Sequence, residues 1–105
     1  MEAKTISQRE REILETIVEI LKKYLNPGRI ILFGSRGKGR FYKNSDFDLA
    51  VDKEKPDIRI ERMILEAIDK VAGLYEADIV YLGSVDKAFK DIILESGKVI
   101  YERGN

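Results

Sequence analysis

Two short hydrophobic runs separated by a basic polar stretch limit the folds open to this chain more than any other feature. The runs are RIILF (29–33) and SDFDLAVD (45–52), and both predict strands. In the second run, apolar residues at odd positions alternate with Asp46, Asp48 and Ala50. Successive strand residues point to opposite faces, so both carboxylates are expected on one face of a sheet.

Segments with helical spacing of apolar residues surround these strands. A helix is expected to begin at a capping box formed by Ser7 and Glu10 and to end at Asn26-Pro27-Gly28. The further expected elements are a helix from Ile58 to near Gly73, a strand over 74–82, a turn at Gly83-Ser84, a helix over 86–96 with Gly97 as its C-cap, and a strand over 98–102. This order predicts one domain, 1–105, of α/β (α+β) class: a small mixed sheet of about four strands covered by helices.

The chain has neither cysteine nor histidine among its 105 residues. Disulfides, thiolate catalysis, zinc fingers and every catalytic pair that uses histidine are therefore excluded. Any catalysis must use carboxylates, a metal held by oxygen ligands, or Lys, Tyr and Ser, and such a metal would be a hard cation such as magnesium. The sequence shows no signal peptide and no run long enough to span a membrane, so we expect a cytoplasmic protein.

The stretch between the two runs favours anion binding. Gly34 and Ser35 follow the first run directly, and the segment 29–43 contains five basic residues and no acidic one. A glycine allows close approach to the backbone, and the amides of a helical turn starting at Ser35 would bind phosphate. Taken alone, such a stretch is more often a solvated loop. It is not a P-loop, because Lys38 is followed by Gly39 rather than Ser or Thr.

Asp46 and Asp48 are candidates for binding a divalent cation. Two carboxylates on one face of a strand repel each other unless positive charge lies between them. Paired carboxylates together with phosphate oxygens are a common way of holding magnesium. A lone D-x-D more often marks an exposed acidic strand face. The Gly34-Ser35 step at the end of the preceding strand favours the metal and phosphate interpretation.

Gly34-Ser35, ten residues, then Asp46-x-Asp48 is similar to the G-S-x10-D-x-D signature of the polymerase-beta-like nucleotidyltransferase superfamily. Over nearly its full length the chain resembles the minimal nucleotidyltransferase (MNT) branch. One departure is Gly37, which stands where relatives often carry a small helix former. A glycine in a helix costs about 1 kcal/mol of stability relative to alanine, so the phosphate-binding turn is expected to be less rigid.

The resemblance implies a third carboxylate on a later strand. Asp78 matches it by position, with Glu76 on the same strand face as the alternative. It further implies that Asp46, Asp48 and Asp78 bind two magnesium ions. Gly34, Ser35 and Arg36 would then hold the phosphates of a nucleoside triphosphate, with ATP favoured by family habit. Two-metal nucleotidyl transfer needs no imidazole, which agrees with the absence of histidine.

The MNT branch is typically paired with a HEPN-domain RNase toxin, to which the antitoxin transfers AMP. The resemblance therefore implies an antitoxin that modifies a hydroxyl of a partner protein. The alternative is a catalytically degenerate MNT-fold protein that neutralises its partner by binding only. The sequence is also compatible with a homodimer. Nucleic-acid binding is disfavoured, because the net charge is zero and no stacking aromatic motif is present.

Overall fold

The computed structural model describes residues 7–34 and 46–104. The elements in chain order are α1 (Gln8–Leu25), β1 (Arg29–Phe33), β2 (Phe47–Val51), α3 (Ile58–Ala72), β3 (Ala77–Tyr81), the 3-10 helix η1 (Leu82–Ser84), α4 (Lys87–Ser96) and β4 (Lys98–Glu102). The alternation of strands and helices that the sequence predicts is confirmed.

The four strands form one mixed sheet in the order β3-β2-β1-β4. β1 pairs antiparallel with both β2 and β4, whereas β2 and β3 run parallel. The parallel pair requires a crossover, and α3 supplies it. The end of β1 and the beginning of β2 therefore lie at the same end of the sheet.

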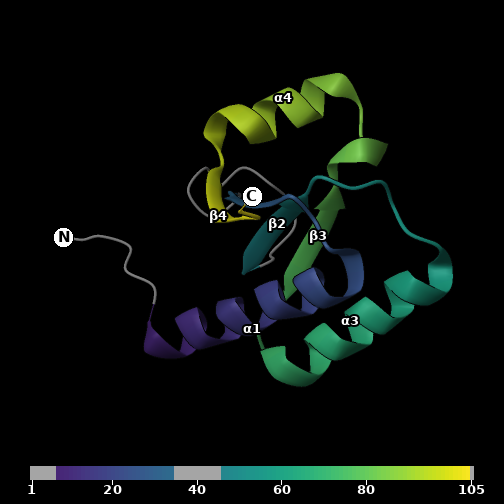
Figure 1. The fold of residues 1–105 in the computed structure, drawn as a ribbon. Helices are drawn as coiled ribbons and strands as arrows, with labels where there is room; N and C mark the ends of the chain where they lie inside the picture. Colours follow the sequence, from purple (N-terminus) through teal and green to yellow (C-terminus); the bar gives the residue numbers. More distant parts are fainter. Residues whose placement is uncertain (1–6, 35–45, 105) are drawn as a thin grey trace.

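Helices cover both faces of this sheet (Figure 1). α1 and α3 lie side by side on one face, and their apolar stripes enclose the main core with residues of β1, β2 and β3. α4 lies on the opposite face over a smaller cluster, which consists of Ile31, Ala50, Leu82 and Ile93. All five residues of β2 are buried, because this strand is central and covered on both faces.

The helix ends follow the capping residues in the sequence. Ser7 and Glu10 form the predicted capping box, with the Glu10 amide donating to Ser7 Oγ at 3.1 Å. Asn26 ends α1 in the left-handed conformation, and its amide donates to the Lys22 carbonyl. Asp57 and Asp86 accept hydrogen bonds from the first-turn amides of α3 and α4. The N-caps satisfy first-turn amides that have no partner within the helix, whereas the Asn26 amide satisfies a carbonyl of the last turn.

The segment before β3 differs from the prediction, because the strand begins at Ala77 rather than at residue 74. Gly73 has φ +64°, and the Tyr75 amide donates to the Ala72 carbonyl, so the chain turns here before it extends. The Tyr75 ring then packs on Phe47, with ring centroids 5.9 Å apart. This turn delivers Glu76 to the beginning of β2.

Gly97 ends α4 as predicted, but for a different reason. It has φ −85°, so it does not adopt the left-handed conformation of a typical glycine C-cap. A Cβ at this position would lie 2.4 Å from Ile31 Cγ2 and 2.7 Å from the Ile93 carbonyl oxygen. The glycine is required by the close approach of the α4–β4 connection to β1. The predicted turn at Gly83-Ser84 belongs to η1.

No helix in residues 7–34 and 46–104 has the length and apolar character needed to cross a membrane.

Candidate active site

The sheet places the predicted carboxylates at one end of the parallel pair β2–β3. Asp48 and Asp78 are register partners in this ladder, so their Cα atoms lie directly opposite each other. Their side chains follow the same alternation as Ala50 and Val80, which pack in the α4-side cluster. The two carboxylates therefore share the α4 side of the sheet.

Asp46 is held next to this pair by the peptide groups of Glu76. The Glu76 amide donates to Asp46 Oδ2 at 3.0 Å. In return, the Glu76 carbonyl accepts hydrogen bonds from the amides of Asp46 and Phe47, at 2.9 and 3.1 Å. These three bonds join the turn before β3 to the beginning of β2, and the bond from the Glu76 amide holds the Asp46 carboxylate.

Asp48 is the only charged residue in the buried part of the described chain, with 6% of its surface exposed. On its other side β2 pairs with β1, where Phe33 is the register partner of Asp48. The Phe33 ring meets Phe89 of α4 edge to face at 6.3 Å. Burying a carboxylate costs free energy unless hydrogen bonds or positive charges compensate the loss of water. Its burial therefore distinguishes Asp48 from the acidic residues on the surface.

Asp78 and Glu76 differ in placement, although both lie near the beginning of β3. Asp78 is half-buried and faces Asp48 across the ladder, whereas the Glu76 side chain is exposed. Glu76 contributes its backbone to Asp46 instead. The geometry thus favours Asp78 as the third carboxylate.

Gly34 directly follows Phe33 at the end of β1, at the same end of the sheet as Asp46. Ser35 and Arg36, the other predicted phosphate-binding residues, lie outside the described residues, as does the predicted phosphate-binding turn. Of the three residues predicted to bind phosphate, Gly34 alone lies in the described part of the chain.

The donor chemistry of this site fits a hard cation, because all of its candidate ligands are carboxylate oxygens. Within residues 7–34 and 46–104, no three acidic side chains gather closely enough to enclose a metal by themselves. Magnesium is commonly held by one or two carboxylates together with substrate phosphates and water. The paired Asp48 and Asp78 fit that arrangement.

Two features of the site could not be identified from sequence. The role of Glu76 in holding Asp46 comes from its peptide group, and no side-chain pattern signals it. The contact of Phe89 with Phe33 has a weak signal, since Phe89 and Ile93 lie four residues apart on one helical face. That spacing predicts an apolar face but not its neighbour.

Comparison with known families agrees with this geometry. A family model described as "Polymerase beta, Nucleotidyltransferase" matches residues 15–105. The chain therefore belongs to the polymerase beta nucleotidyltransferase family, and it is a nucleotidyltransferase.

Among individual proteins, the chain is similar to protein adenylyltransferase MntA of Aphanizomenon flos-aquae. The two are 34% identical over 101 residues, which covers 87% of this chain and 67% of that protein. It is 30% identical over 93 residues to the probable protein adenylyltransferase MntA of Haemophilus influenzae, covering 88% of this chain and 82% of the relative.

Solved structures share the fold. A crystal structure of a toxin–antitoxin with AMP-PNP superposes with a TM-score of 0.59 at 24% identity, covering 85% of this chain and 73% of that chain. A mutant of the toxin–antitoxin MntA-HpeT gives a TM-score of 0.57 at 21% identity, covering 85% and 72% of the two chains.

Proposed function

We propose that this protein transfers AMP from ATP to a hydroxyl group of a partner protein. The observation that carries the proposal is the placement of Asp46, Asp48 and Asp78 at one end of β2 and β3. Asp48 and Asp78 are paired in register there, and Asp46 is oriented by the Glu76 peptide. Two relatives at 30% identity or more are named as a protein adenylyltransferase and a probable one, which supports adenylyl transfer over other nucleotidyl transfers.

In the proposed reaction, the acceptor oxygen forms a bond to the α-phosphorus of ATP and the bond to the β-phosphate oxygen breaks. Pyrophosphate leaves, and the hydroxyl proton passes to the Asp78 carboxylate or to water. Asp46, Asp48 and Asp78 would hold two magnesium ions, whose charge lowers the pKa of the attacking hydroxyl. Gly34, Ser35 and Arg36 would bind the β- and γ-phosphates.

The proposed partner is the toxin of a toxin–antitoxin pair, with a HEPN-domain RNase as the specific candidate. Its support is the similarity to MntA proteins and the shared fold with toxin–antitoxin structures. In this proposal the chain acts as an antitoxin in the cytoplasm by modifying the toxin. A protein that neutralises the toxin by contact alone is the alternative that the experiment must separate.

The test is label transfer in an extract of the cells from which the gene comes. Wild-type protein is incubated with extract, magnesium and ATP labelled at either the α- or the γ-phosphate. We expect α-label, and no γ-label, to become covalently attached to an acceptor protein. Asp48→Asn should abolish the transfer, whereas the matched control Asp69→Asn, on the exposed surface of α3, should retain it.

Three results would contradict the proposal. Transfer of γ-label would show phosphoryl rather than adenylyl transfer. Equal α-label transfer by wild type and Asp48→Asn would remove the acidic site from the reaction. If neither label is transferred although wild type and Asp48→Asn both protect cells from the toxin, the protein acts by contact alone.

A further inference from the structure

A cavity lies on the α4 side of the sheet at the end away from Asp48. It is lined by Arg29 and Ile31 of β1, the residues 52–54 that follow β2, Leu82 and Gly83 of η1, and Lys90 and Leu94 of α4. Asp48 is paired with the last residue of β1, whereas Arg29 is the first. The two places are roughly 13 Å apart along the strand, at 3.3 Å per residue.

The walls of this cavity are held by backbone contacts. The Gly83 amide donates to the Lys53 carbonyl at 3.0 Å, and the Lys55 amide donates to Ser84 Oγ at 2.8 Å. A Cβ on Gly83 would lie 2.8 Å from Glu54 Cγ, so the two segments are in close contact. The cavity is therefore bounded by connected elements rather than by separate loops.

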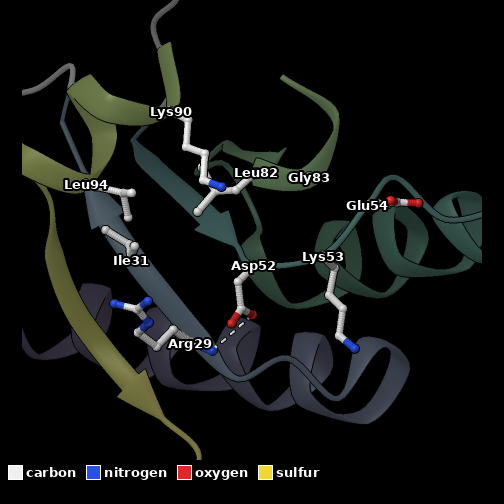
Figure 2. A pocket seen from close by; sticks show the side chains of 9 residues that line it. All are labelled: Arg29, Ile31, Asp52, Lys53, Glu54, Leu82, Gly83, Lys90 and Leu94. Atoms are coloured by element: carbon white, nitrogen blue, oxygen red, sulfur yellow. Dashed lines mark hydrogen bonds between the residues drawn. The ribbon is translucent and has the colours of Figure 1, made fainter. Parts of the chain in front are cut away.

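The charges that face the cavity are mainly positive. Figure 2 shows Lys90 reaching down from α4 and Arg29 on the opposite side, while the ends of Lys53 and Glu54 point away from the other lining residues. The Asp52 carboxylate also lines the cavity, and its Oδ1 accepts from the amides of Gly28 and Arg29 at 2.9 and 3.1 Å. Two cations and one carboxylate therefore border this space.

Neither Arg29 nor Lys90 takes part in an ion pair within the described chain. The cations that do so there are Lys22, Lys55, Arg59 and Lys87. Arg29 stands opposite Glu102 in the β1–β4 ladder, and still no ion pair joins the two side chains. Each of the two side chains is therefore available for a charge-assisted hydrogen bond to an anion in the cavity.

The remaining lining is apolar and the space is small. Leu94 is 42% exposed and offers most of the accessible aliphatic surface, whereas Ile31 and Leu82 line the cavity with only 3% and 4% of their surface exposed. The volume is about 220 Å³, which is below the roughly 300–1,000 Å³ of pockets for drug-sized ligands. The combination of two cations with an aliphatic wall suits a small anion that carries a short apolar group.

We propose that this cavity is a second ligand site, which binds a small organic anion with a carboxylate or phosphate headgroup and a short aliphatic tail. The headgroup lies between Arg29 and Lys90, and the tail contacts Ile31, Leu82 and Leu94. This site is separate from the acidic site, and its existence does not depend on adenylyl transfer.

The test is an NMR titration of the full chain, labelled with ¹⁵N, at constant ionic strength. The probes are acetate, butyrate and butyl phosphate, with sodium chloride as the blank. We expect butyrate to cause saturable shifts at the amides of Ile31, Gly83 and Lys90, and to bind more tightly than acetate because of its tail. Whichever of butyrate and butyl phosphate binds more tightly identifies the headgroup, and either order supports the site.

The variants separate a built site from general surface charge. Arg29→Gln combined with Lys90→Gln should weaken butyrate binding about fivefold or more, as expected for the loss of two exposed charge contacts. Arg9→Gln combined with Lys70→Gln removes the same charge from α1 and α3, and binding should be unchanged. Glu54→Gln should leave binding equal or stronger.

Three outcomes would overturn the proposal. These are shifts no different from those caused by sodium chloride, equal weakening in both double variants, or equal affinity for acetate and butyrate. The last outcome would show that the aliphatic wall takes no part.

Discussion

Tyr81 carries the one buried side-chain polar atom without a hydrogen-bond partner in the described chain, its hydroxyl oxygen. The residue ends β3 and is 6% exposed, with its ring in the main core. An unpaired buried hydroxyl loses its hydrogen bonds to water and gains none in return. We therefore expect Tyr81→Phe to leave the free energy of unfolding unchanged or to raise it by about 1 kcal/mol. Urea unfolding measures this, and a loss of more than about 1 kcal/mol would show that the hydroxyl has a partner.

The same residue predicts a change with pH. Burial, and to a smaller degree the Glu61 carboxylate, raises the pKa of Tyr81 above its ordinary value of 10.0. The folded state then holds this proton more tightly than the unfolded state. Its contribution to stability is complete below pH 10 and is lost as the pH rises through the folded-state pKa. The stability of wild type should fall more steeply above pH 10 than that of Tyr81→Phe, and parallel curves would contradict this.

The carboxylates show how far single residues can be predicted. Asp46 and Asp48 were expected on one sheet face, and Asp78 was expected from the family resemblance as a third carboxylate on a later strand. The structure places Asp48 and Asp78 opposite each other. The alternation of side chains along a strand is enough to predict that Asp48 lies on the sheet face opposite to Phe47 and Leu49. The hydrogen bond from the Glu76 amide to the Asp46 carboxylate joins residues 30 positions apart and uses only the backbone of Glu76, so no side-chain pattern could reveal it.

At the scale of elements, the α4–β4 connection depends on Gly97. A methyl group there meets Ile31 and the Ile93 carbonyl at distances that require the surroundings to move. We expect Gly97→Ala to destabilise the protein by about 1–3 kcal/mol, as overpacking does. Gly104→Ala is the matched control, because nothing lies within 4 Å of a Cβ at that position. Thermal unfolding measures both, and equal melting temperatures would contradict the close approach.

Element boundaries were predicted well where a capping side chain sets the end of a helix, and less well where a backbone turn sets the start of a strand. Ser7, Asp57 and Asp86 each accept amide hydrogen bonds at a helix start, and such caps are visible in the sequence. The beginning of β3 was predicted too early. The apolar run from Leu74 suggested strand, but the backbone turn after Gly73 delays it to Ala77.

At the scale of the whole molecule, the two layers differ in how much core they share with the sheet. Among residues 7–34 and 46–104, the cluster under α1 and α3 contains eleven buried residues, whereas the cluster under α4 contains four. A region with less buried apolar surface opens at lower free energy. We expect the amides of α4 to exchange hydrogen with solvent faster than those in the middle of α1 and α3. Uniform protection of all three helices would show that they unfold as one unit.

The fold class, a mixed sheet covered by helices, was predictable because hydrophobic periodicity indicates which segments form helices and which form strands. The order β3-β2-β1-β4 rests on pairings between distant segments, such as Asp48 with Asp78, which a local pattern cannot specify. No strand order was predicted. The spacing of Gly34-Ser35 and Asp46-x-Asp48 contributed the family resemblance and the candidate site, which periodicity alone does not indicate. The cavity between Arg29 and Lys90 had no such signature and came from the structure alone.

In the proposed function, the acidic end of β2 and β3 binds a metal-bound nucleoside triphosphate. Calorimetric titration of ATP, CTP, GTP and UTP, with and without magnesium, tests it most directly on wild type, Asp48→Asn and the control Asp69→Asn. We predict that wild type and Asp69→Asn bind ATP only with magnesium, and that Asp48→Asn remains folded but does not bind. Magnesium-independent binding, or unchanged binding by Asp48→Asn, would contradict the assignment of the site.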